Sequence, residues 1–330
     1  MKSWFKVAAA VTLLTALPMV AGFGPEDKKS TVQVDAALKD YTPVQGISGT
    51  IKSIGSDTLN NLMTHWTELF NKYYPAVRVE VEGKGSSTAP PALTAGQSQF
   101  GPMSREMKSA EIDEFEKKWG YKPTALRVAV DSLAIYVHKD CPLDEISMEN
   151  AMKVFSVAGP EMTWGDLGLT SAEYKSKPVS LYGRNSASGT YGFFKEHVLE
   201  KKDFKNAVKE QPGSSAVVQG VANDKFGMGY SGIGYKTADV KALRVIPKGG
   251  KAGVAATADN AYSGEYPIAR FLYIYINHDP KKALDPLRAE FVKTIYSKQG
   301  QESVIKDGYF PVTADIARED LTVLGIKPNF

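Results

Sequence analysis

Four short turns rich in Gly, Ser and Thr carry the residues of this sequence that are best suited to chemistry. They lie at Gly55–Thr58, Gly83–Thr88, Gly101–Glu106 and Gly183–Thr190. Each follows a segment with strand features, and three of them enter a predicted helix. The N–H groups at a helix start lack partners and carry a partial positive charge, and small residues let an anion approach them closely. The four turns together therefore indicate a site for an oxyanion.

Side chains in the same turns add two kinds of hydrogen-bond donor. Ser and Thr supply hydroxyl groups, and Arg105 and Arg184 supply a planar fork that matches the paired oxygens of a tetrahedral anion. Any one turn alone is more often a helix cap than a binding site, because Ser, Thr and Asp are preferred caps. The combination favours a ligand, above all Arg184 four residues before Ser188-Gly189-Thr190.

The elements that must position these turns alternate between strand and helix. Apolar residues recur at three- and four-residue steps over 58–74, which predicts a helix. Val alternates with charge over 77–81, as in a strand. Further strands are predicted at 47–54, 98–103, 127–138, 179–182, 228–230 and 268–277, and further helices at 90–95, 109–119, 191–199, 285–298 and 301–307. This alternation predicts an α/β fold.

Two of these strands, 127–138 and 268–277, are long and bracket a central insert. A chain that leaves one domain, builds a second and returns gives two lobes joined by two crossover strands, with a ligand cleft between them. The length of 330 residues suits two domains. The expected division is a tail at 23–46, with order beginning at Gly46, lobe 1 at 47–135 with 265–330, and lobe 2 at 136–264.

The N-terminus has the features of a secretory signal peptide. Lys2 and Lys6 precede an apolar run over 7–20, and small residues end it near Gly22. The run is shorter than the roughly 20 residues that span a bilayer. Residues 1–22 are therefore expected to be cleaved near Gly22, and without a nearby Cys no lipid anchor is expected.

Composition and charge argue against several classes of protein. Hydrophobic residues make up 43% and charged residues 23%, which is typical of a globular chain. The formal charge of +3 falls to +1 without the leader, too little for a nucleic-acid-binding face. The scattered histidines, His65, His138, His197 and His278, have no partners at metal-ligand spacing, so no metal site is expected. Cys141 is the sole cysteine and cannot form an internal disulfide.

Enzyme signatures are also missing from the sequence. No Gly-x-Ser-x-Gly motif is present, and the Gly-rich turn around Lys84 lacks the spacing of a nucleotide phosphate loop. We therefore expect a binding protein that needs no cofactor.

Several motifs give the chain a family resemblance. From about Gly46 to Val312 it resembles the periplasmic phosphate-binding proteins of ABC importers, which are type II solute-binding proteins. The matching segments are Gly85-Ser86-Ser87, Ser104-Arg105-Glu106, Arg184 to Thr190, Gly213 to Gln219, Gly227 to Tyr230 and Tyr266 to Arg270.

The resemblance implies a two-lobed periplasmic binding protein fold and a soluble monomer. Such a protein captures inorganic phosphate in the periplasm and presents it to the membrane permease of an ABC importer, without covalent chemistry. On matching positions, and with the two departures below, the phosphate-binding residues are expected to be Ser56, Asp57, Thr58, Ser86, Ser87, Ser104, Arg105, Arg184, Ser188, Gly189 and Thr190.

Two positions depart from the family pattern. Better-known members carry an Asp that accepts the phosphate proton where this chain has Arg105, and another Asp where it has Ser186. The proton acceptor is then expected to be Asp57, with Glu106 second, although Asp57 has equal claim to be a cap for the helix that starts at Thr58. Arg105 is expected either to contact the anion or to pair with Glu106 or another carboxylate at the rim.

Two other functions stay open on the sequence. Some relatives of this fold have been linked to phosphatase activity, so a phosphomonoesterase is one alternative. A binding protein for another oxyanion, such as sulfate or molybdate, is the other.

Overall fold

Strands and helices alternate along the chain, as the sequence predicts. The structure is a computed structural model that describes residues 32–330, so the predicted signal peptide (1–22) and the first part of the predicted tail (23–31) lie outside the described residues. The strands are β1 (Gly49–Gly55), β2 (Val77–Gly83), β3 (Phe100–Met103), β4 (Thr124–His138), β5 (Glu145–Ser147), β6 (Ser180–Arg184), β7 (Lys209–Gln211), β8 (Gly227–Gly232), β9 (Val240–Ala242), β10 (Arg244–Ile246) and β11 (Ala269–Ile276).

The α-helices are α1 (Asn60–Tyr73), α2 (Ala89–Thr94), α3 (Ser109–Trp119), α4 (Met148–Phe155), α5 (Gly189–His197), α6 (Ser214–Ala222), α7 (Ala258–Tyr262), α8 (Pro286–Ile295), α9 (Lys298–Lys306) and α10 (Ala314–Val323). Short 3-10 helices occur at η1 (Asp57–Leu59), η2 (Ser86–Thr88) and η3 (Ile233–Tyr235).

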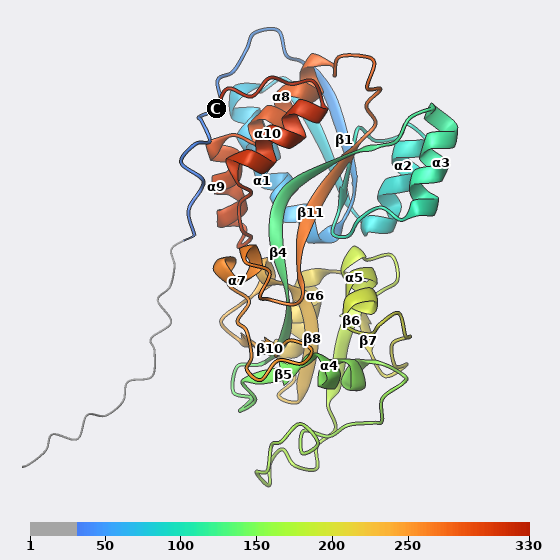
Figure 1. Cartoon of the computed structure of the whole chain (residues 1–330), viewed down its shortest axis with the longest axis vertical. Helices are drawn as coiled ribbons and strands as arrows, with labels where there is room; N and C mark the ends of the chain where they lie inside the picture. Colours follow the sequence, from blue (N-terminus) through green and yellow to red (C-terminus); the bar gives the residue numbers. More distant parts are fainter. Residues whose placement is uncertain (1–31) are drawn as a thin grey trace, which may run out of the picture. The chain divides into compact units, whose positions relative to one another are not determined.

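Most of the strands belong to one sheet, and β4 is its central member. The order is β2-β1-β3-β11-β4-β8-β6-β7, with β9 also paired to β4. The first part of β4 pairs antiparallel with β11, and its last part pairs antiparallel with β8. Helices α1, α8, α9 and α10 lie around the β1, β4 and β11 end of the molecule, and α4, α5 and α6 around the β6 and β8 end (Figure 1).

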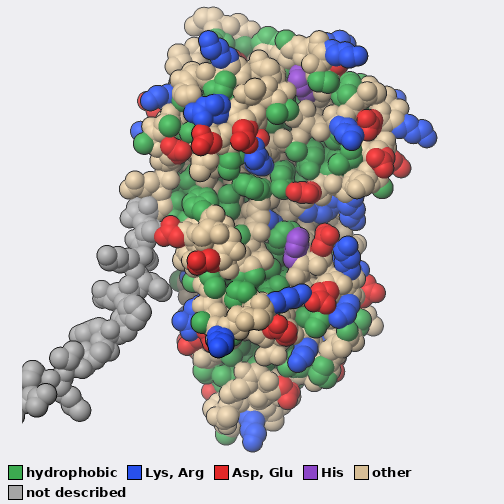
Figure 2. Space-filling view, viewed as in Figure 1, with side chains coloured by type: hydrophobic (Ala, Val, Ile, Leu, Met, Phe, Trp, Pro, Cys, Tyr) green, Lys and Arg blue, Asp and Glu red, His purple; other side chains and the backbone are tan. Residues whose placement is uncertain are grey.

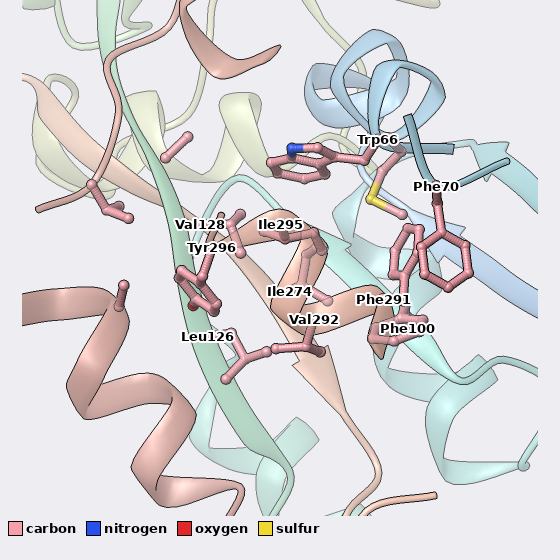
Figure 3. Packing of buried hydrophobic residues seen from close by; sticks show 14 of the residues in the cluster. Trp66, Phe70, Phe100, Leu126, Val128, Ile274, Phe291, Val292, Ile295 and Tyr296 are labelled. Carbon is pink, nitrogen blue, oxygen red and sulfur yellow. The ribbon is translucent and has the colours of Figure 1, made fainter. Parts of the chain in front are cut away.

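The two largest hydrophobic cores of the described residues lie along β4. Core 1 takes its buried residues from 38–129 and 272–326, and it packs Trp66 and Phe70 of α1 near Phe291 of α8 (Figure 3). Core 2 takes its buried residues from 133–268, including Phe194 and Tyr230, whose rings stack with centroids 4.0 Å apart. The chain thus leaves core 1, builds core 2 and returns, so the expected two-lobed α/β fold is confirmed.

The chain packs against core 1 before Gly46, the residue at which the sequence predicts ordered structure to begin. Residues 32–46 were expected to form part of a tail, but Leu38 and Tyr41 are buried in core 1. The Tyr41 hydroxyl lies 2.5 Å from that of Tyr74 and donates to Glu290 at 2.6 Å. The expectation was wrong because two apolar residues in a polar stretch carry no periodic signal, although they are enough to fasten the segment to the lobe.

The surface carries both signs of charge. On the face drawn in Figure 2, Lys and Arg side chains alternate with Asp and Glu side chains, in keeping with the formal charge of +3. Within residues 32–330, no helix is both long enough and apolar enough to cross a membrane.

Candidate anion-binding site

The four turns singled out in the sequence come together where the two cores meet. Strand β1 runs parallel to both β2 and β3, so the turns that follow these strands leave from one edge of the sheet. The turn after β6 approaches them from the other lobe. The backbone bonds that join the four turns are Ser56 N–H to Pro102 O (2.8 Å), Gly85 N–H to Gly55 O (2.8 Å) and Ser87 N–H to Ala187 O (3.1 Å).

Three serine hydroxyls form the centre of this cluster. Ser56 donates to the Ser104 hydroxyl at 3.1 Å, and the hydroxyls of Ser104 and Ser86 lie 3.2 Å apart. All three side chains are buried. Gly189 lies directly against them, since a β-carbon there would sit 2.2 Å from Ser86 Oγ and 2.6 Å from Ser104 Oγ. Only glycine lets the start of α5 come this close to the hydroxyls of the other lobe.

The start of α5 also brings donors to the cluster. Ser188 is the N-cap and accepts hydrogen bonds from the backbone N–H of Thr190 and Tyr191 at 3.1 and 3.3 Å. The Thr190 hydroxyl lies 3.0 Å from the Thr58 hydroxyl across the lobes. The helix start therefore faces a group of hydroxyls, which is the environment that favours an anion.

Arg184 is almost fully buried beside the start of α6. Its Nη1 donates to Ser214 Oγ at 2.7 Å and lies 3.2 Å from Asp57 Oδ2, while its Nε finds no hydrogen-bond partner within residues 32–330. Burial lowers the pKa of the Arg184 guanidinium, and the nearby Asp57 carboxylate opposes that shift. A buried cation with an unused donor is costly, and an anionic ligand would offset that cost.

Asp57 does not cap its own helix. Its Oδ2 accepts a hydrogen bond at 2.8 Å from the backbone N–H of Ser214, the first residue of α6 in the other lobe. The same oxygen faces Arg184. The alternative that Asp57 caps the helix after Thr58 is therefore wrong, because the side chain satisfies a distant helix start.

Arg105 and Glu106 have their side-chain partners outside the group of Ser56, Ser86 and Ser104. Arg105 makes a bidentate pair with Glu111 of α3, at 2.8 and 2.7 Å, and also donates to Ser87 Oγ at 3.3 Å. Burial by itself would raise the pKa of the Glu111 carboxyl. The hydrogen bonds from Arg105 and from the Lys108 backbone outweigh that effect and hold the pKa of Glu111 below its usual value. Glu106 is exposed and accepts a hydrogen bond from the Tyr273 hydroxyl at 3.1 Å. The structure thus does not bring Glu106, the second candidate for proton acceptor, into the cluster.

Several residues in the cluster were missed in the sequence. Ser214, noted there only as part of a family motif, contacts both Arg184 and Asp57. Arg270 of β11, likewise noted only as part of a family motif, donates to Thr190 Oγ1 at 2.9 Å and pairs with Asp131 of β4. Asp131 and Arg270 could have been found from the sequence, because each is a charged residue inside a largely apolar strand, and such residues are rarely buried without a partner.

The chemical groups of the cluster are suited to holding an anion. Apart from the carboxylates of Asp57 and Asp131, its groups are hydroxyls, a helix start and guanidinium groups, all of which can donate to an oxygen. In the part of the chain that the structure describes, no group of three His, Cys, Asp or Glu side chains is placed to hold a metal ion. Donors that converge from both lobes of an α/β fold define a solute-binding protein for an oxyanion.

Comparison with known proteins gives the same class. Residues 41–299 match the model of the PBP superfamily domain. The phosphate-binding protein PstS of Pseudomonas aeruginosa is 50% identical over 320 residues, which cover 95% of this chain and 98% of that protein. PstS of Staphylococcus haemolyticus is 26% identical over 307 residues, 92% of this chain and 91% of that protein. The chain therefore belongs to the PBP superfamily and, within it, to the family of PstS phosphate-binding proteins.

Solved structures share the fold. A proposed phosphate ABC transporter substrate-binding protein from Clostridium perfringens, solved with bound phosphate, aligns with a TM-score of 0.68 at 23% identity and covers 80% of this chain and 100% of that one. An ABC-type phosphate transport receptor from Vibrio cholerae aligns with a TM-score of 0.63 at 21% identity, over 79% of this chain and 100% of that one.

Proposed function

We propose that this protein binds inorganic phosphate in the periplasm and delivers it to the membrane permease of an ABC-type phosphate importer, without catalysing a reaction. The observation that carries the proposal is Arg184, a buried cation whose Nε has no partner among the described residues and which lies at the start of α6. The 50% identity to a phosphate-binding protein over nearly the whole chain supports phosphate as the anion.

The proposed ligand contacts follow from the donors that already meet. In the structure the hydroxyls of Ser56, Ser86 and Ser104 bond to one another, and a tetrahedral anion would accept from them instead. Pairing with Glu111 supports a place for Arg105 at the rim, with Ser87, rather than on the anion. The residues proposed to contact phosphate are Ser56, Thr58, Ser86, Ser104, Arg184, Ser188, Gly189 and Thr190, with Asp57 accepting its proton.

The proposed lobes are residues 47–135 with 265–330 and residues 136–264. The two cores support two lobes, but they place the boundaries a few residues differently, since core 2 also takes Leu133 and Ile135 of β4 and Tyr266 and Ile268 before β11. Phosphate would be held between the lobes, because three of the four turns belong to the first lobe and the fourth, 183–190, belongs to the second.

The proposed location and state rest on separate observations. Export depends on residues 1–22, which lie outside the described residues. A monomer that meets the permease is our proposal for the working form, and light scattering of the purified protein tests it.

Calorimetry of the mature protein, stripped of bound ligand, tests the function. Phosphate should bind, and sulfate and molybdate should bind more weakly or not at all. Arg184→Ala should lose about 2–5 kcal/mol of binding free energy, as truncated buried charge pairs do. The matched control is Arg244→Ala, an exposed arginine of the same lobe that pairs with Glu145 and should bind normally.

Two results would overturn this function. One is tighter binding of sulfate or molybdate than of phosphate. The other is turnover of a chromogenic phosphate ester, with or without added metal ions, which would favour the phosphomonoesterase.

A further inference from the structure

A buried ion pair joins the two crossover strands next to the anion site. Asp131 of β4 and Arg270 of β11 face each other across the antiparallel ladder. Arg270 donates from Nε at 3.0 Å and from Nη2 at 2.8 Å to the same oxygen, Asp131 Oδ2. Asp131 is 0% exposed and Arg270 7%. A buried pair of this kind is weak evidence for stability, since desolvation cancels much of the attraction, so its other contacts are informative.

The guanidinium of Arg270 touches both lobes. Its Nη1 donates to the backbone oxygen of Ser104 at 2.7 Å, in the turn after β3. Its Nη2 donates to Thr190 Oγ1 at 2.9 Å, at the start of α5. The ring of Phe193 covers its face, with the guanidinium carbon 5.1 Å from the ring centroid. One side chain on a crossover strand thereby fixes two of the turns that meet at the site.

The bond to Thr190 also restricts which way that hydroxyl points. Arginine can only donate, and a threonine hydroxyl has one proton and two acceptor sites. Because Thr190 Oγ1 accepts from Arg270, its own proton must point away from the guanidinium. Thr58 Oγ1 lies 3.0 Å away on the other side, and either hydroxyl can be the donor in that contact. An anion between these lobes would meet Thr190 as a donor.

We propose that Arg270, held by Asp131, is a positioning residue that commits the Thr190 hydroxyl to donate to the bound oxyanion. The proposal rests on the proposed function, because it assigns a specific task to a residue behind the same site. Without Arg270 the Thr190 hydroxyl is free to rotate and to present lone pairs, which repel an anion. The effect of Arg270 on affinity therefore passes through Thr190.

A double-mutant cycle on phosphate affinity tests this inference. The variants are Arg270→Lys, which keeps a cation near Asp131 but loses the fork, Thr190→Val, and the two combined. We expect each single change to weaken binding by about 10- to 100-fold, as expected for loss of a hydrogen bond to a charged group. The double variant should bind phosphate with an affinity within a few fold of that of the weaker-binding single variant. The control is Arg127→Lys, which lies on the neighbouring strand β4 and pairs with Asp320, and it should leave the affinity unchanged.

A purely structural role for Arg270 gives a different result. The two losses would then multiply in the double variant, and that outcome overturns the proposal. Unchanged affinity in Arg270→Lys would also overturn it. If Arg270→Lys does not fold, the same cycle is run with Arg270→Gln in an Asp131→Asn background, which removes both buried charges.

The cycle can be separated from the proposed function. Failure of the unaltered protein to bind phosphate would contradict the function, and the cycle would then be run with the oxyanion that does bind. Binding of phosphate together with multiplying losses would contradict only the role of Arg270.

Discussion

Asp57 connects the lobes through a single oxygen. Its Oδ2 accepts from the backbone of Ser214 and faces Arg184, so the carboxylate closes a small network that spans both sides of the site. Phosphate carries a proton at neutral pH and sulfate does not, so a fixed carboxylate attracts the first and repels the second. Arginines and hydroxyls alone favour any oxyanion.

Replacement of Asp57 by Asn tests this discrimination. The side chain keeps its shape but loses its charge and turns one acceptor oxygen into a donor. We expect Asp57→Asn to weaken phosphate binding by about tenfold, or ~1.4 kcal/mol, and to narrow the gap between phosphate and sulfate in competition assays. Asp144→Asn, in an exposed pair with Lys241, is the matched control. Unchanged selectivity between phosphate and sulfate would show that Asp57 only connects the two lobes through Ser214 and Arg184, and that another group accepts the proton of phosphate.

At the scale of helices and strands, local patterns explain what the sequence predicted well. Helix α3 has the predicted bounds of 109–119, and α1 follows the apolar spacing after a short 3-10 turn. The turns themselves were visible because Gly, Ser and Thr stand out at the ends of strands. That they meet is confirmed by the bonds between them, whereas their contact with phosphate stays a prediction.

What the sequence did not predict depends on distant contacts. Helix α6 was not recognised as an element, although its buried residues, Ser214, Val217, Val218 and Val221, lie three and four residues apart on one face. The helix has only nine residues and begins with two serines next to Gly213, which resemble a turn. The bond from Asp57 to Ser214 joins positions 157 apart, and no local spacing signals it. The pairing of Arg270 with Asp131 likewise depends on the register of β4 and β11.

Asp307, an acidic residue between α1 and α9, lies where its negative charge is unfavourable. Asp307 follows the C-terminal end of α9, where a negative charge opposes the helix dipole. Its side chain is 10% exposed, and Oδ2 has no hydrogen-bond partner in the described part of the chain. Burial raises the pKa of Asp307 to about 7, and His65 Nε2 lies 3.8 Å from its other oxygen.

This acid should make stability depend on pH. The unfolded pKa of Asp is about 3.9, so between about pH 4 and pH 7 the folded protein binds more protons than the unfolded chain, and stability falls as pH rises. Asp307→Asn should therefore be more stable than the unaltered protein by about 1–3 kcal/mol at pH 8 and nearly equal to it at pH 4. Urea unfolding at the two pH values measures the difference. If Asp307→Asn changed the free energy of unfolding equally at pH 4 and pH 8, ionisation of Asp307 would not be the cause of the change.

At the scale of the whole molecule, β4 is shared by both lobes. Core 1 uses its first half and core 2 its second half, and β11 returns beside it. The site lies where this strand passes from one core to the other. A change in the relative position of the lobes would therefore act on Asp131, Arg270 and the four turns at once.

The same chain path has a consequence for the order of folding. Core 2 is built from one uninterrupted segment, 133–268, whereas core 1 must join 38–129 to 272–326. Closing long loops is slow because their entropy is lost before the contacts form. Pulse-labelled hydrogen exchange during refolding should show β8 amides protected before those that pair β3 with β11, and the reverse order would contradict this pathway. A chain interrupted before residue 269 would hold every residue of core 2 while lacking β11 and the three last helices that complete core 1.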